Sequence, residues 1–110
     1  MTPALRELDA AALDALTAEG QPVLAEFFGP DCIICRQLEP MLGAVARETA
    51  GRLAVVRVDA STNPALADRL AIRSLPTLIL YTGGAAQARR SGFMTAGELR
   101  RWVRPALAEV

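Results

Sequence analysis

Short continuous runs of apolar residues along the chain predict β-strands. Three such runs, each bounded by glycine, proline or polar residues, cover residues 23–28, 53–59 and 77–81. A run of this length between turn residues is typical of a strand that is covered on both faces. A pair of glycines after the last run predicts a turn into residues 87–91, which we expect to form an antiparallel partner strand.

Apolar residues that recur every three or four positions predict four helices. The first is expected to follow Asp9 as its N-cap, and a longer one covers about residues 32–49. A short helix is expected over residues 63–70, and Thr95, followed by a glutamate three positions later, has the pattern of a cap for the last helix.

The order of these elements predicts an α/β fold with a mixed central sheet and helices on both faces. Strands 23–28 and 53–59 are joined by the long helix, so they form a βαβ unit and are expected to lie parallel. The hairpin after the glycine pair adds an antiparallel pair. A chain of 110 residues has the size of one domain, so we expect a single domain over residues 1–110.

Cys32 and Cys35 are the only two cysteines of the chain, and they directly follow a predicted buried strand. A strand that leads into a CxxC at the start of a helix is the layout of a dithiol redox site. The two thiols lie within one helical turn, so one can attack a foreign disulfide while the other expels the product. The spacing therefore predicts thiol–disulfide exchange.

Charge and hydropathy restrict the classes of partner and the cellular location that we expect for the protein. The chain has 12 basic residues, all arginine, and 12 acidic residues, so its formal net charge is zero. We therefore expect neither nucleic acid nor an anionic membrane surface as a partner. No stretch has the length of a spanning helix and no secretory signal is visible at the N-terminus, which predicts a cytoplasmic protein.

From about residue 23 to the C-terminus, the ordered motifs resemble the thioredoxin family. The shared features are a strand with a buried acid, an aromatic pair, a CxxC, a proline within the following helix, a proline loop, a Gly-Gly turn and a late glycine. In this sequence they are Glu26, Phe27-Phe28, Cys32 to Cys35, Pro40, Leu75-Pro76-Thr77, Gly83-Gly84 and Gly92. The resemblance implies a thioredoxin fold and a redox-active disulfide that needs no further cofactor.

The chain departs from the family pattern between and beside the cysteines. The family usually has Trp-Cys-Gly-Pro-Cys, whereas here Asp31 precedes Cys32, and Ile33 and Ile34 stand between the cysteines. We expect Asp31 to raise the pKa of the Cys32 thiol, because a negative neighbour opposes the thiolate. An exposed Ile33 would offer an apolar contact to a partner, and Ile34 is expected to pack into the core. The sequence leaves the direction of electron flow open.

Each cysteine has an expected role in the exchange reaction. Cys32 is expected to be the nucleophile, since the helix start favours its thiolate, and Cys35, one turn deeper, is expected to resolve the mixed disulfide. Glu26 is expensive to bury as a lone charge, so its pKa should rise and it is a candidate proton relay for Cys35. Arg57 on the neighbouring strand favours the alternative of a purely structural Glu26–Arg57 pair.

The resemblance also implies a substrate groove and a set of partners. The Leu75–Pro76 peptide bond is expected to be cis and to face the cysteines, where an extended chain would bind. The expected groove residues are Asp31, Ile33, Leu75, Pro76, Thr77, Gly92 and Phe93. The expected partners are disulfide-bearing proteins and a flavoenzyme of the thioredoxin-reductase type, and the expected state is a monomer.

Two other functions fit the same residues. A binding or chaperone-like module on this fold would use the apolar groove and keep the cysteines as residual features. A metal site would need ligands beyond two thiolates, and the chain has no histidine and no other cysteine, so it would require two copies facing each other. We therefore predict no metal in a single copy.

Overall fold

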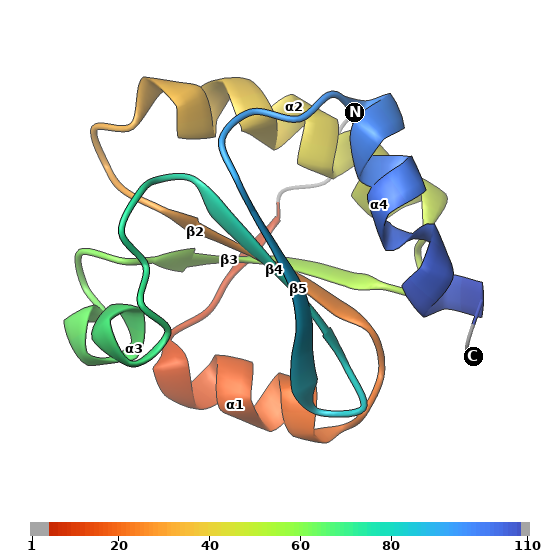
Figure 1. Cartoon of the computed structure of the whole chain (residues 1–110), viewed down its shortest axis with the longest axis horizontal. Helices are drawn as coiled ribbons and strands as arrows, with labels where there is room; N and C mark the ends of the chain where they lie inside the picture. The colour runs from red at the N-terminus through yellow and green to blue at the C-terminus, as the bar shows by residue number, and fades with distance from the viewer. Residues whose placement is uncertain (1–4, 109–110) are drawn as a thin grey trace.

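The computed structural model describes residues 5–108 (Figure 1). The elements, in chain order, are β1 (Arg6–Glu7), α1 (Ala10–Ala18), β2 (Val23–Phe28), α2 (Ile33–Glu48), β3 (Ala54–Asp59), α3 (Pro64–Arg69), β4 (Thr77–Thr82), β5 (Ala85–Ser91) and α4 (Ala96–Ala108). Every strand and helix expected from the apolar pattern is present. The sequence pattern missed β1, because this strand is two residues long and both residues are charged.

The strands form one five-stranded sheet in the order β1-β3-β2-β4-β5. β3 runs parallel to β1 and to β2, while β4 runs antiparallel to β2 and to β5. This arrangement confirms the expected parallel pair and the antiparallel hairpin. In the centre of the sheet, Glu26 of β2 lies opposite Arg57 of β3 on one side and Leu78 of β4 on the other.

Helices cover both faces of this sheet: α2 and α4 lie on one face, and α1 and α3 lie on the other (Figure 1). Side chains alternate along a strand, so Leu24 and Glu26 of β2 point to the α2 and α4 face, and Val23, Ala25 and Phe27 point to the opposite face. Every residue of β2 is buried. Within residues 5–108, no helix has both the length and the apolar character needed to cross a membrane.

Two helix starts are held by the side chains that the sequence predicted. The Asp9 side chain accepts a hydrogen bond of 2.8 Å from the Ala12 amide. At the start of α4, the Glu98 amide donates to Thr95 Oγ1 at 3.1 Å, and the Thr95 amide donates to Glu98 Oε1 at 2.9 Å. This reciprocal pair confirms the expected capping box.

Helix α2 carries both cysteines, with Cys32 as its N-cap. The side chains that it buries recur at intervals of three and four residues, and they include Cys35, Leu38, Leu42 and Val45. The prediction that Ile34 packs into the core was wrong, since this side chain is 41% exposed. Ile34 precedes Cys35, so it lies about 100° away around the helix from the buried face.

Candidate active site

The two cysteines lie where β2 leaves the sheet and α2 begins. They are joined by a disulfide, with a Cα–Cα distance of 5.2 Å. Cys32 is partly exposed, whereas Cys35 is 1% exposed and belongs to the buried face of α2. An attacking reagent therefore meets Cys32 first, as the expected division of roles requires.

The backbone around the cysteines stabilises negative charge on Cys32. The Cys35 amide donates a hydrogen bond to the Cys32 Sγ at 3.1 Å. This amide belongs to the first turn of α2, whose amides have no partner within the helix and carry the positive end of its dipole. Such an environment lowers the free energy of a thiolate relative to that of a thiol.

The proline loop lies against the segment that leads into the cysteines. The Leu75–Pro76 peptide bond is cis, as the resemblance implied. A Cβ placed on Gly29 would lie 2.8 Å from the Cδ1 atom of Leu75, so the two segments are in contact. The Gly92 amide donates to the Pro76 carbonyl at 3.0 Å, which brings the start of the segment before α4 to the same place.

All the large apolar side chains that are exposed within the described residues belong to the first turn of α2, the proline loop or the segment before α4. We call them the apolar rim: Ile33 (65% exposed), Ile34 (41%), Leu75 (39%) and Phe93 (45%). Asp31 is also exposed beside Cys32. Two of the expected groove residues, Pro76 and Thr77, are buried, and the Thr77 hydroxyl donates to the Ser74 carbonyl at 2.6 Å. The Thr77 side chain therefore braces the proline loop.

Glu26 is a fully buried acid on the sheet face that α2 covers. Its Oε1 accepts a hydrogen bond of 3.0 Å from Arg57 Nε, and its Oε2 has no partner. Burial raises the pKa of Glu26 from its ordinary value of 4.5 to about 7, although the hydrogen bond and the charge of Arg57 oppose this rise. The carboxyl group can thus change its protonation near neutral pH.

Arg57 is shared between two carboxylates. Besides the bond of its Nε to Glu26, its Nη2 contacts Glu39 Oε1 of α2 at 2.6 Å. The guanidinium also stacks over the Phe28 ring, 3.8 Å from the ring centroid. The sequence reasoning missed Glu39. Its position four residues after Cys35, next to it along the helix, was the available signal.

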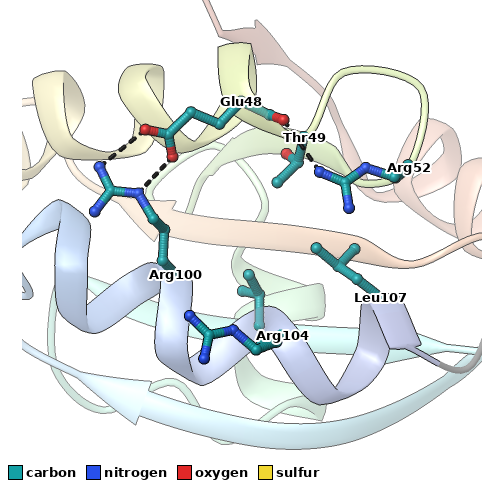
Figure 2. A pocket seen from close by; sticks show the side chains of 7 residues that line it. Glu48, Thr49, Arg52, Arg100, Arg104 and Leu107 are labelled. Atoms are coloured by element: carbon teal, nitrogen blue, oxygen red, sulfur yellow. Dashed lines mark hydrogen bonds and ion pairs between the residues drawn. The ribbon is translucent and has the colours of Figure 1, made fainter.

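A cavity of about 330 Å³ lies between α2 and α4, near the C-terminal end of α2 and thus away from the cysteines (Figure 2). Its residues include Glu48, which binds Arg100 through two hydrogen bonds of 2.6 and 2.9 Å. The cavity also includes Thr49, but its hydroxyl donates to the Val45 carbonyl. No cysteine lines this cavity, so the exchange chemistry belongs to the other end of α2.

Metal ligands are not clustered in the described part of the chain. Among residues 5–108, no three His, Cys, Asp or Glu side chains lie together in a way that would hold a metal ion.

Comparisons with known proteins agree with this geometry. The sequence model of the family described as thioredoxin matches residues 5–105. The chain is 40% identical over 63 residues to "Thioredoxin 1" of Nostoc sp. (strain PCC 7120), covering 57% of this chain and 59% of that protein. It is 32% identical over 88 residues to "Thioredoxin M4, chloroplastic" of Arabidopsis thaliana, covering 80% of this chain and 46% of that protein. The matched segments thus span less than two thirds of these relatives.

A solved structure is similar over nearly the whole length. The crystal structure of chloroplastic thioredoxin z matches with a TM-score of 0.87 and 29% sequence identity, covering 98% of both chains. The five-stranded mixed sheet with helices on both faces is therefore a thioredoxin fold, as expected. Together with the family match over residues 5–105, this shows that the chain belongs to the thioredoxin family.

Proposed function

We propose that the protein exchanges thiols and disulfides through Cys32 and Cys35, and that it reduces disulfide bonds in other proteins. The observation that carries this proposal is the disulfide at the first turn of α2, where the Cys35 amide donates to the Cys32 Sγ. A sulfur held in this way is stabilised as a thiolate, which is the form that attacks a disulfide.

The reaction begins with the reduced protein. The Cys32 thiolate attacks one sulfur of the target disulfide, the target S–S bond breaks, and the released target sulfur takes a proton from water. Cys35 then loses its proton and attacks the Cys32 Sγ, so that the Cys32–Cys35 bond forms while the second target sulfur leaves and is protonated. The target gains two electrons and two protons, and the dithiol becomes a disulfide.

Within this reaction, we assign Glu26 the role of the base that takes the proton from Cys35. The buried carboxyl lies on the sheet face that α2 covers, has one free oxygen, and has a pKa of about 7. A base with a pKa near the working pH both accepts and releases a proton readily. The hydrogen bond of 3.0 Å to Arg57 supports the alternative, a structural ion pair.

The apolar rim and the cis-proline loop would bind the target. An extended chain seated beside the Pro76 loop would meet exposed apolar side chains from the adjoining segments, namely Ile33, Leu75 and Phe93. We propose disulfide-bearing proteins as targets and a flavoenzyme of the thioredoxin-reductase type as the donor that returns two electrons. Asp31 and the glycine at position 92 would border the groove, and Pro40 would shape α2 behind it.

The remaining sequence-based expectations stay predictions. They are a single domain over residues 1–110, a monomer, and a cytoplasmic location. Two of the similar proteins are named as chloroplastic, and fractionation of the cells measures the location of this protein directly.

The exposed apolar rim also favours a second candidate function, a binding module. Four large exposed apolar side chains on the CxxC helix start and the segments beside it favour an interaction surface whether or not the cysteines react. Replacement of Cys32 and Cys35 by serine separates the two functions. A binding module would keep its partner after this change, whereas an exchange enzyme would lose its reaction.

The deciding experiment is a redox titration of the Cys32–Cys35 disulfide in graded thiol buffers, read by alkylation and intact mass. We expect a reversible two-electron transition, with a midpoint toward about −270 mV for a reductase and toward about −120 mV for an oxidant. The Cys35→Ser variant should accumulate a mixed disulfide on Cys32 when a disulfide-bearing protein is added. Absence of a reversible intramolecular disulfide would overturn the exchange mechanism and favour the binding module.

A further inference from the structure

We propose that Glu39 is a positioning residue for the exchange reaction. It binds the Arg57 guanidinium from the α2 side, and Arg57 therefore compensates only part of the negative charge of the Glu26 carboxylate. This inference rests on the proposed function, in which Glu26 accepts a proton from Cys35. It assigns a role to a residue outside the CxxC motif and outside the expected groove.

The geometry that carries the proposal is a single cation between two unequal anions. Arg57 lies 2.6 Å from Glu39 and 3.0 Å from Glu26, while the side chains of Glu39 and Glu26 are 40% and 0% exposed. The stacking of the guanidinium on Phe28 holds Arg57 at this position. Arg57 therefore uses one nitrogen for each carboxylate and leaves Glu26 Oε2 without a partner.

The other groups around Glu26 do not replace this link. On the same sheet face, β3 presents Arg57 and, at its end, Asp59, and the Asp59 side chain accepts hydrogen bonds from Ser61. The buried residues of β4 and α4 on this face are apolar. Helix α2 contributes Glu39 and the buried Cys35. Glu39 is thus the carboxylate that competes with Glu26 for the guanidinium.

The consequence for the reaction follows from charge. The negative charge of Glu39 adds to the rise in the pKa of Glu26 that burial causes. A free, deprotonated Glu26 is needed to take the proton from Cys35, and a neutral Glu26 is needed to return one in the reverse direction. Glu39 therefore helps to keep the pKa of Glu26 near neutral pH, where the carboxyl can both take a proton from Cys35 and return one.

The test compares Glu39→Gln with a matched control, Glu48→Gln. Glutamine at position 39 keeps an oxygen acceptor for Arg57 and removes only the charge. Glu48 also lies on α2 and also binds an arginine, Arg100, but at the far end of the helix. Two quantities are measured for each variant: the titration of the Glu26 carboxyl carbon by NMR in the oxidised protein, and the rate of mixed-disulfide resolution against pH.

For Glu39→Gln we expect the NMR midpoint of Glu26 to fall by about one pH unit, and the resolution rate at pH 6 to rise about fivefold with little change above pH 8. Glu48→Gln should leave both profiles unchanged. An unchanged NMR midpoint in Glu39→Gln, or an equal shift in Glu48→Gln, would overturn the proposal. A shifted midpoint with an unshifted rate profile would also overturn the positioning role. If the midpoint shifts but no variant exchanges disulfides, the proposed function fails while the charge coupling stands.

Discussion

Gly29 and Leu75 lie so close together that a Cβ added to Gly29 would be 2.8 Å from Leu75 Cδ1. This contact joins the segment before Cys32 to the loop that contains the cis proline. Because Leu75 is 39% exposed, its side chain has room to turn toward solvent if the contact is blocked.

Gly29→Ala should therefore displace Leu75 at a modest cost in stability. We expect the free energy of unfolding to fall by about 1 kcal/mol, at the lower end for an overpacked site. The rate of exchange with a protein disulfide should fall further than the rate with a small aromatic disulfide, because only the protein target uses the rim. Denaturant unfolding and the two exchange assays measure these effects.

The double variant Gly29→Ala, Leu75→Ala is the control for this prediction. Removal of the Leu75 side chain removes the close contact, so the added methyl at position 29 should then cost almost nothing. Equal costs in the two backgrounds would contradict the proposed contact.

The buried acid should make stability depend on pH in a particular window. The pKa of Glu26 rises from 4.5 to about 7 on folding, so the folded protein keeps a proton that the unfolded chain releases between these values. Raising the pH from 4.5 to above 7 should therefore remove about 3 kcal/mol of the free energy of unfolding. Urea unfolding of the oxidised protein across this range measures the change.

Glu26→Gln should lack this pH dependence. The carboxyls of Glu48 and Glu98 have lowered pKa values, because each accepts hydrogen bonds from its partner, and so they affect stability below pH 4.5. Above pH 4.5, we therefore expect Glu26 to account for most of the change in the free energy of unfolding with pH. If Glu26→Gln and the unchanged protein lose the same stability between pH 5 and 8, Glu26 does not carry the proton.

The most exposed rim residue should affect protein targets selectively. Ile33 is 65% exposed, so Ile33→Ser should leave the folding free energy nearly unchanged. If a target covers this side chain, the loss of about 1.5 kcal/mol of apolar burial corresponds to about a tenfold fall in kcat/KM for a protein disulfide. Gln37→Ser, an exposed change on the same helix, should have no such effect. A similar loss with a small disulfide would point instead to altered cysteine chemistry.

Asp31 should tune the nucleophile by its charge. In the reduced protein, Asp31→Asn removes a negative charge beside Cys32 and should lower the pKa of the Cys32 thiol. Thiolate absorbance at 240 nm against pH, in the Cys35→Ser background, follows this single titration. Asp68→Asn on α3 provides a control at an exposed aspartate outside the site. A rise in the pKa, or an equal fall in both variants, would remove Asp31 from the mechanism.

Much of the fold could be predicted because its signals are local. The apolar runs of β2 and β4 and the caps at Asp9 and Thr95 each lie within a few residues. β1 carries no such signal, since its two charged residues are ordered only by pairing with β3. Ile34 was predicted wrongly because its spacing from the apolar residues that follow fits one face of a helix. The face that α2 actually buries includes Cys35, so the residue before it points elsewhere.

The candidate site was predictable only in part for a related reason. The CxxC and the proline loop are motifs that can be recognised in the sequence itself. The group formed by Glu26, Glu39 and Arg57 joins three separate elements, and the second link of Arg57 becomes visible only once α2 is packed on the sheet. The spacing of Glu39 from Cys35 along α2 is a local signal, but it does not specify Arg57 as the partner of Glu39.

The burial of Cys35 has a consequence for oxidative damage. Cys32 is partly exposed, whereas Cys35 is only 1% exposed, so a peroxide reacts first with Cys32 in the reduced protein. The first product is therefore a sulfenic acid at Cys32. Cys35, with its Cα 5.2 Å from that of Cys32 in the disulfide, can condense with the sulfenic acid and release water. Closure of the disulfide then competes with the irreversible steps to sulfinic and sulfonic acid, so the same burial that orders the two thiols also protects the protein from overoxidation.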